Sequence, residues 1–206
     1  EFAALKELAW LTPFFGRLVA EDIGIQEEPV AGFAPARAVR IQAEDWGRLA
    51  HQARLWGCRW VGCWGEDLGD DLVIHACFEK DAGYLVARTL VPKASPLLPS
   101  HTPHYPAANR PERHIQDMFG VAFSDHPDTR RWTRHRAWKS GHYPLRKNVP
   151  AAGTPPEETP PDDAYKFLFA HGAGVYEIPV GPVHAGIIEP GHFRFQAVGE
   201  TVLNLE

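Results

Sequence analysis

Hydrophobic positions between residues 38 and 119 recur with two periods, one typical of strands and one typical of helices. Strict alternation predicts strands, whereas apolar residues three and four apart predict helices. The connections after the first helix are short, which favours antiparallel pairing of the strands that follow. We therefore predict an α+β fold: a small, mostly antiparallel sheet with helices on one face. The predicted strands are 38–42, 58–64, 72–79 and 84–92, and the predicted helices are 44–56 and 111–119.

The N-terminal residues carry weaker patterns. Residues 2–11 are apolar on most sides, which predicts a helix packed into a protein interface. Thr12 followed by Pro13 is typical of an N-cap and a first helical position, so we expect a second short helix to begin there. Residues 24–36 contain two glycines and two prolines and are predicted to form a loop.

Proline marks a boundary in the last third of the chain. Residues 150–161 contain five prolines, a composition typical of a linker. Beyond it, 192–198 and 201–206 predict a C-terminal β-hairpin closed at Gly199 and Glu200. We predict a helical N-terminal segment, a first domain that ends in a loop-rich basic segment, a linker, and the start of a second domain. Their ranges are 1–36, 37–149, 150–163 and 164–206.

Composition narrows the class of protein. A formal charge of −5 over 206 residues argues against a general binder of polyanions. Cys58, Cys63 and Cys77 show no Cys-x-x-Cys spacing, which argues against a disulfide framework or an iron–sulfur site and favours a reducing, cytoplasmic setting. No apolar run approaches the ~18 residues needed to cross a bilayer. Since no signal peptide is evident and the first residue is Glu1, we expect a piece of a longer protein.

The basic segment, residues 130–147, carries seven Lys or Arg residues and no acidic residue. Trp132, Trp138 and Tyr143 lie between these cations. Three interpretations stay open at this point. The segment docks on an acidic partner surface, where Arg and Trp are favoured anchors, or it pairs with the protein's own carboxylates. The third is that it binds single-stranded nucleic acid by stacking and phosphate contacts.

The helix predicted before the basic segment carries charges beside its apolar face. Arg113 and Asp117 are four residues apart and therefore share a face. Together with Glu112, Arg130 and Arg131 they indicate an ion-pair network that fixes the following loop, or else a docking or catalytic acid. No nucleophile is placed beside a base and an oxyanion donor, so we predict no catalytic residue in this chain.

Histidines are scattered along the chain. His101 and His104 have a spacing found in zinc sites, but no second pair of ligands accompanies them, so zinc is the weaker alternative. Near the C-terminus, His184, Glu189 and His192 stand beside Gly-Pro and Pro-Gly turns. They indicate a proton relay or the lining of a pocket, since histidine titrates near neutral pH. A tight structural turn explains them equally well.

Several short motifs occur in an order that resembles the C subunit of NADH–quinone oxidoreductase, the respiratory complex I. They are Glu112-Arg113, Asp117-Met118-Phe119-Gly120, His126-Pro127-Asp128, Arg130-Arg131 and, after His142, Pro144-Leu145-Arg146-Lys147. His114, Asp125, Asn148 and an inserted Tyr143 depart from that pattern. The tail from Glu177 resembles the start of the large subunit of group 4 membrane-bound nickel–iron hydrogenases, the formate hydrogenlyase and hydrogenase-4 type, in which a C-like domain precedes a catalytic domain.

The resemblance implies an accessory, docking part of an oxidoreductase. The chain would scaffold the large subunit against its iron–sulfur partner, beside membrane subunits, on the inner face of the plasma membrane. A nickel–iron centre would lie in the following domain, and iron–sulfur clusters in partner subunits, so we expect no cofactor, metal or nucleic acid on this chain. A quinone-linked NADH dehydrogenase C/D subunit is the alternative.

The resemblance also implies roles for individual residues. Those expected to fix the docking loop are Glu112, Arg113, Asp117, Arg130 and Arg131. Those expected to contact a partner subunit are Arg146 and Lys147. Those expected to shape a redox-linked or proton-linked hairpin beside the cofactor cavity are His184, Glu189 and His192.

Overall fold

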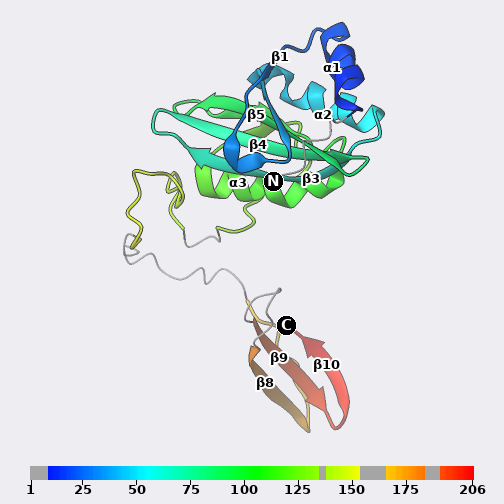
Figure 1. Cartoon of the computed structure of the whole chain (residues 1–206). Helices are drawn as coiled ribbons and strands as arrows, with labels where there is room; N and C mark the ends of the chain where they lie inside the picture. The colour runs from blue at the N-terminus through cyan, green and yellow to red at the C-terminus, as the bar shows by residue number, and fades with distance from the viewer. Residues whose placement is uncertain (1–8, 135–137, 154–165, 184–190) are drawn as a thin grey trace, which may run out of the picture. The chain divides into compact units, whose positions relative to one another are not determined.

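The computed structural model describes residues 9–134, 138–153, 166–183 and 191–206. The chain divides into two compact units, 1–159 and 160–206, which are described separately. The first unit is built on a five-stranded sheet of order β1-β2-β5-β4-β3 (Figure 1). Its strands are β1 (Ile25–Glu27), β2 (Arg37–Ile41), β3 (Arg59–Asp67), β4 (Asp71–Lys80) and β5 (Gly83–Pro92).

The pairing of these strands confirms the predicted α+β fold with a mostly antiparallel sheet. β3, β4 and β5 form the antiparallel meander, with His75 of β4 between Trp64 of β3 and Arg88 of β5. β2 runs parallel to β5, and β1 pairs antiparallel with β2 at the edge. The parallel pair arises because the chain leaves β2 through a helix and returns to the sheet at its far edge.

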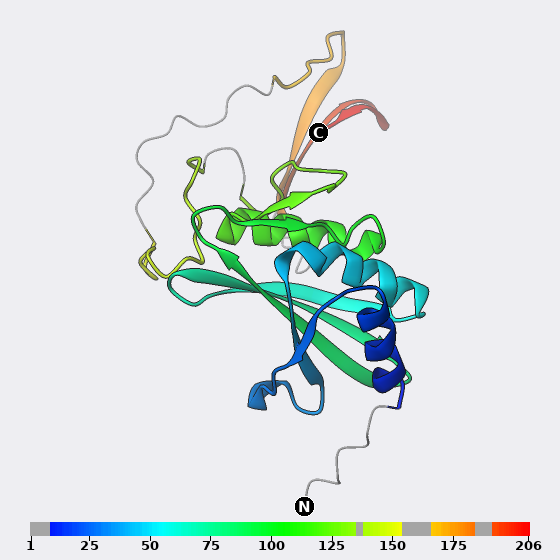
Figure 2. The same ribbon diagram turned by 90° about the horizontal axis from the view of Figure 1, so that it is seen from above.

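Three helices share one hydrophobic core with the sheet. They are α1 (Leu11–Ala20), α2 (Trp46–Leu55) and α3 (Asn109–Phe119) (Figures 1 and 2). Alternate residues of β4, among them Ile74 and Phe78, join this core with Phe14 of α1, Leu49 of α2 and Ile115 of α3. The helices therefore pack against the face of the sheet that carries these alternate residues, as predicted.

Short elements complete the first unit. They are the 3-10 turns η1 (Ala31–Phe33), η2 (Ala43–Asp45) and η3 (Pro106–Ala108), and the parallel pair β6 (Leu97–Pro99) and β7 (Ala122–Ser124). α3 ends at Gly120, whose φ of +79° is the left-handed conformation that a helix C-terminus favours in glycine. The predicted helix 111–119 is therefore confirmed, with its start two residues earlier.

Two predictions near the N-terminus were wrong. α1 begins at Leu11 with Trp10 at the N-cap position, so Thr12 does not cap it. Trp10 and Leu11 are buried, and their packing sets the start of the helix in place of a hydroxyl cap. The segment 24–36, predicted as a loop, contains the short strand β1 and the 3-10 turn η1. The strand was missed because three residues are too few to show an alternating pattern. The helix expected over 2–11 falls mostly on residues 1–8, which lie outside the described part.

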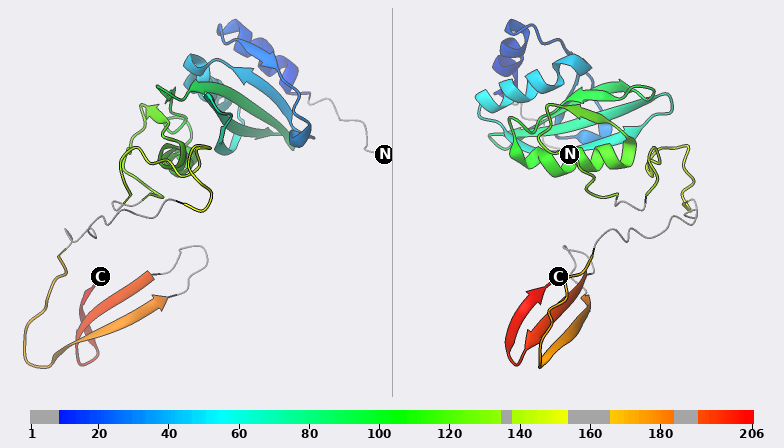
Figure 3. Two further views of the ribbon diagram at one scale, coloured as in Figure 1. Left: turned by 90° about the vertical axis from the view of Figure 1, so that its left-hand side faces the viewer. Right: turned by 180° about the vertical axis from the view of Figure 1, so that it is seen from behind.

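The second unit contains a three-stranded antiparallel sheet of order β10-β9-β8 (Figure 3). β9 (Gly191–Val198) and β10 (Thr201–Leu205) form the predicted hairpin, with Val198 paired to Thr201. β8 (Val175–Val183) was not predicted as a strand. Its two prolines argue against a central strand, but β8 lies at the sheet edge, where proline is tolerated.

Candidate docking segment

Asp117 of α3 organises the start of the basic segment. One carboxylate oxygen, Oδ2, accepts hydrogen bonds from the backbone N–H groups of Trp132, Thr133 and Arg134 at 2.8, 2.7 and 2.9 Å. Asp117 is fully buried, so these bonds lie out of water, where a bond to a charged group is strong. The three consecutive amides are thereby held in one conformation.

Arg113 lies one helical turn before Asp117 and holds the two residues of the basic segment that precede Trp132. Its guanidinium donates to the carbonyl oxygens of Arg130 and Arg131 at 2.7 and 3.1 Å, and it lies 2.9 Å from Oδ2 of Asp128. Asp128 also pairs with the Arg130 side chain at 2.8 Å. Hydrogen bonds from Arg130, joined by the charge of Arg113, hold the pKa of the Asp128 carboxyl well below its usual range. The structure thus brings together four of the five residues predicted to fix this loop.

Glu112, the fifth, is directed elsewhere. Its carboxylate accepts bonds from Ser100 Oγ, the His101 backbone N–H and Thr102 Oγ1 at 2.6, 2.6 and 2.7 Å. Nε2 of His126 lies 3.6 Å away. Burial raises the pKa of the Glu112 carboxyl despite these donors. Glu112 therefore fixes the turn at 100–102 and not the backbone of the basic segment.

The other end of the basic segment is fastened to the end of α3 and to β3. The Leu145 N–H donates to the Met118 carbonyl at 3.2 Å, and Arg146 Nε donates to the Phe119 carbonyl at 2.8 Å. The Lys147 N–H donates to Asp67 Oδ2 at 2.7 Å. Arg146 and Lys147, predicted as partner contacts, thus also attach the segment to its own domain.

Tyr143 and Arg134 link the two attachments. A Cβ placed on Gly120 would lie 2.5 Å from the Tyr143 ring, so this ring packs directly on the glycine that ends α3. The guanidiniums of Arg134 and Arg146 lie 5.0 and 4.5 Å from the ring centroid. Arg134 also donates to the carbonyl oxygens of Lys139 and His142. Neither Arg134 nor Tyr143 was predicted as a site residue. The insertion of Tyr143 into the motif pattern of the family could have indicated a local role for this residue.

Trp132 is an exposed aromatic side chain on a fixed backbone. Half of its surface is accessible, while its N–H is held by Asp117. The guanidiniums of Arg110 and Arg113 lie 4.7 and 5.4 Å from the indole centroid. Such cation–π contacts restrain the ring without covering it. An aromatic group with so little conformational freedom is suited to contact a partner.

The paired histidines do not form a metal centre. His101 is buried, stacked on Trp46 with ring centroids 4.7 Å apart, and its Nε2 lies 3.0 Å from the Trp46 carbonyl oxygen. Burial lowers the pKa of His101 to about 3. His104 faces His51 instead, with ring centroids 4.9 Å apart. Among the described residues, no three His, Cys, Asp or Glu side chains converge on a position for a metal ion.

The predicted hairpin residues near the C-terminus are only partly described. His184 and Glu189 lie outside the described residues. His192 is an exposed residue of β9, and its Nδ1 would lie 3.0 Å from a Cβ on Gly181 of β8. A shared role for these three residues remains a prediction. Within the described ranges, no helix combines the length and the apolar character needed to span a bilayer.

Three curated relatives resemble this chain. Hydrogenase-4 component G of Escherichia coli (strain K12) is 37% identical over 123 residues, which is 60% of this chain and 22% of that protein. Formate hydrogenlyase subunit 5 of the same strain is 34% identical over 124 residues, again 60% and 22%. The C/D subunit of NADH-quinone oxidoreductase from Methylococcus capsulatus is 46% identical over 74 residues, 35% and 12%. The chain spans about a fifth of the length of the first two.

One solved structure shares the fold of this chain, and a sequence model shows its family. The archaeal membrane-bound sulfane sulfur reductase, a respiratory membrane complex, contains a chain that matches with a TM-score of 0.51 at 17% identity, covering 66% of this chain and 84% of that one. This likeness shows a shared fold. Residues 39–155, more than half of the chain, match the sequence model of the respiratory-chain NADH dehydrogenase 30 kDa subunit. The resemblance to the complex I C subunit is thereby confirmed, and the chain belongs to this 30 kDa subunit family.

Proposed function

We propose that this chain is the docking region of a membrane-associated, multisubunit oxidoreductase, and that the basic segment is the surface that docks. Its relatives are subunits of hydrogenase and NADH-quinone oxidoreductase complexes. The observation that carries the proposal is the double attachment of the segment. Asp117 and Arg113 hold residues 130–134, and Asp67 with the end of α3 holds 145–147.

Preorganisation is the physical reason why this arrangement favours docking. Ordering a loop at an interface costs roughly 0.5–1.5 kcal/mol for each immobilised side chain. A segment that is already fixed avoids much of that cost, so its exposed Trp132 and cations retain more of their contact energy for a partner. Trp and Arg are the residue types that most often dominate such interfaces.

The partners we propose are the large-subunit domain of the same polypeptide, an iron–sulfur subunit and membrane subunits, on the inner face of the plasma membrane. The matched residues make up only 22% of each curated hydrogenase relative, which leaves room for such a domain. The donor atoms of the described residues do not suit a nickel–iron centre, because Cys58, Cys63 and Cys77 form no pair and no ligand group converges. We place that centre in the remainder of the polypeptide.

A quinone-linked NADH dehydrogenase C/D subunit is the second candidate. The similarity to the Methylococcus capsulatus C/D subunit supports it. Both candidates use the docking segment in the same way and differ in the chemistry of the domain that follows. Hydrogen oxidation by the assembled complex would favour the hydrogenase, and quinone reduction with NADH would favour the dehydrogenase.

Truncation of the exposed indole tests the docking proposal. We expect Trp132→Ala in the full-length polypeptide to reduce assembly of the membrane complex about tenfold, a loss of roughly 1.4 kcal/mol. Native gel electrophoresis of solubilised membranes measures this, and thermal unfolding of the chain checks that it stays folded. Leu55→Ala, at a side chain that is 58% exposed on α2, is the matched control. Equal assembly of both variants would refute the docking role of the segment.

A further inference from the structure

The arginines of the basic segment carry charge that backbone groups do not neutralise. Arg134 donates to the carbonyl oxygens of Lys139 and His142, and Arg146 donates to that of Phe119. Carbonyl oxygens are good acceptors but bear no net charge. Within the described residues, neither guanidinium has a carboxylate within ion-pair distance. Arg134 is buried, so the positive charge that is open to a ligand is that of Arg146, which lines a pocket.

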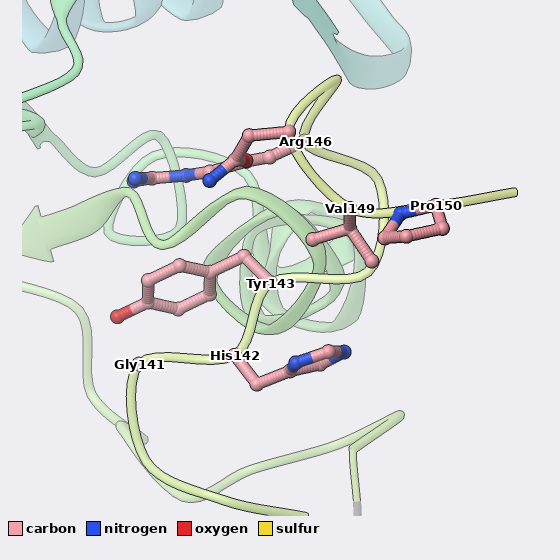
Figure 4. Close-up of a pocket in the computed structure, with 7 residues that line it drawn as sticks. Gly141, His142, Tyr143, Arg146, Val149 and Pro150 are labelled. Carbon is pink, nitrogen blue, oxygen red and sulfur yellow. The ribbon is translucent and has the colours of Figure 1, made fainter. Parts of the chain in front are cut away.

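This pocket has a volume of about 250 Å³. Figure 4 shows Arg146 and Tyr143 on one side of it and His142 beneath Val149 and Pro150. All of the lining comes from one short stretch of chain, and none of it is acidic. The lining residues are Gly141, His142, Tyr143, Arg146, Asn148, Val149 and Pro150.

We propose that this pocket receives the carboxylate of an Asp or Glu side chain from a partner protein. The inference rests on the proposed docking function and names the chemistry that the docking segment recognises. Arg146 supplies the geometry for a charge-assisted contact, and His142, Tyr143 and Asn148 supply further hydrogen-bond donors. Val149 and Pro150 provide an apolar wall for the methylene groups of the acidic side chain.

The distribution of charge favours a protein carboxylate over nucleic acid. Seven of the 21 basic residues lie in the basic segment, so the remainder of the chain has 14 basic against 26 acidic residues. A long polyanion that extends past the segment would gain little further attraction from this net acidic remainder, and surface charges more than about 10 Å apart are largely screened at 0.1 M salt. A single carboxylate on a protein surface needs only the local positive field.

A peptide titration tests the pocket. The probe is an octapeptide of alternating Glu and Gly, and its Gln–Gly counterpart shows what the charge contributes. Isothermal titration calorimetry measures binding, because the chain contains seven tryptophans and its fluorescence would not report on the pocket alone. We expect the Glu peptide to bind the 206-residue chain, with Arg146→Gln weakening binding about tenfold. Arg54→Gln removes the same charge from an exposed residue of α2 outside the basic segment, and we expect less than a twofold change.

The Arg146 substitution also removes the bond to Phe119 and could loosen the segment, so a second variant tests the pocket with this bond intact. Asn148→Asp places a carboxylate at the pocket while leaving the bonds to Asp67 and Phe119 in place, and we expect it to weaken the Glu peptide as well. Equal effects of Arg54→Gln and Arg146→Gln would overturn the proposal, because they would show attraction to the net charge of the chain and not to the pocket. Binding of the Gln peptide, or displacement by inorganic phosphate or a single-stranded oligonucleotide at matched concentration, would overturn it too.

The pocket proposal and the docking proposal are tested by separate experiments, so one can be refuted without the other. Loss of complex assembly in Trp132→Ala is read in membranes, whereas peptide affinity is read on the isolated chain. Peptide binding that depends on Arg146, in a chain whose Trp132 is dispensable for assembly, would leave the pocket standing and remove the docking role. If Trp132→Ala impaired assembly but peptide binding did not depend on Arg146, only the pocket proposal would be refuted.

Discussion

A single buried carboxylate determines the path of the chain after α3. Asp117 Oδ2 is the acceptor for three successive amides, and Asp117 Oδ1 lies buried without a hydrogen-bond partner among the described residues. Nε of Arg134 is buried and unpaired in the same way. The conformation of the basic segment is thus governed by one side chain and its near neighbours.

Replacement of this carboxylate by an amide of the same shape tests its role. We expect Asp117→Asn to lower the free energy of unfolding by about 2–4 kcal/mol, because an amide oxygen is a weaker acceptor and its NH₂ group brings donors to a buried site. Urea denaturation measures the loss. Asp125→Asn is the control: Asp125 is exposed and has a φ of +59°, which Asn adopts as readily. Similar losses in both variants would show that the three amide bonds do not matter.

At the scale of elements, α3 and the basic segment fit each other through a glycine and a tyrosine. Gly120 has a positive φ, and the Tyr143 ring packs so closely on it that there is no room for a Cβ. The left-handed conformation alone costs an L-residue roughly 1–2 kcal/mol. Contact with the ring adds a steric cost that exists only while Tyr143 is present. The two contributions are therefore separable by experiment.

A double-mutant cycle separates them. We expect Gly120→Ala to lower the free energy of unfolding by more than about 2 kcal/mol in the native background, and by only about 1–2 kcal/mol in a Tyr143→Ala background, where the strained φ alone remains. Chemical denaturation of the four proteins gives the coupling energy. Additivity within about 0.5 kcal/mol would mean that the ring does not press on Gly120 in solution.

The same scale shows what the sequence could and could not predict. Short apolar runs bounded by turn residues revealed β3, β4 and β5, and apolar spacing with a terminal glycine revealed α3. β1 and β8 were missed because a three-residue strand shows no period and because proline disguised an edge strand. Residues on one helix face, such as Arg113 and Asp117, could be grouped by spacing. Asp67 could not, because its bond to the Lys147 N–H joins positions 80 residues apart in the sequence.

At the scale of the whole first unit, neutral histidines are buried within the fold. His75 of β4 is stacked on Trp64 with ring centroids 4.9 Å apart and meets the edge of Phe33 at 5.6 Å. Burial, followed by the charge of Arg88, lowers the pKa of His75 to about 4. His101, in the core with the helices, also has a lowered pKa. Both side chains oppose protonation in the folded protein and accept it when the chain unfolds.

The sign of the pH dependence follows from these lowered pKa values. Near pH 7 neither state binds the proton, so the contribution to stability is complete. As the pH falls below about 6.5, the unfolded chain binds protons that the folded chain excludes, and the free energy of unfolding decreases until the folded pKa is reached. For His75 this loss amounts to roughly 3 kcal/mol between pH 6.5 and 4. Glu112, whose pKa burial raises, acts in the opposite direction below its own pKa.

Replacement of the His75 ring by one that does not titrate measures the contribution of His75 to the loss of stability at acidic pH. Phenylalanine keeps an aromatic ring between Trp64 and Phe33 but binds no proton, so we expect His75→Phe to lose roughly 3 kcal/mol less than the native chain between pH 7 and pH 4. Urea unfolding at a series of pH values measures the difference. His171→Phe changes an exposed histidine of the second unit and should leave the slope unaltered. If His75→Phe and the native chain lost stability in parallel, His75 would have to be accessible to protons in the folded protein, and the packing of Phe33 over it would have to open in solution.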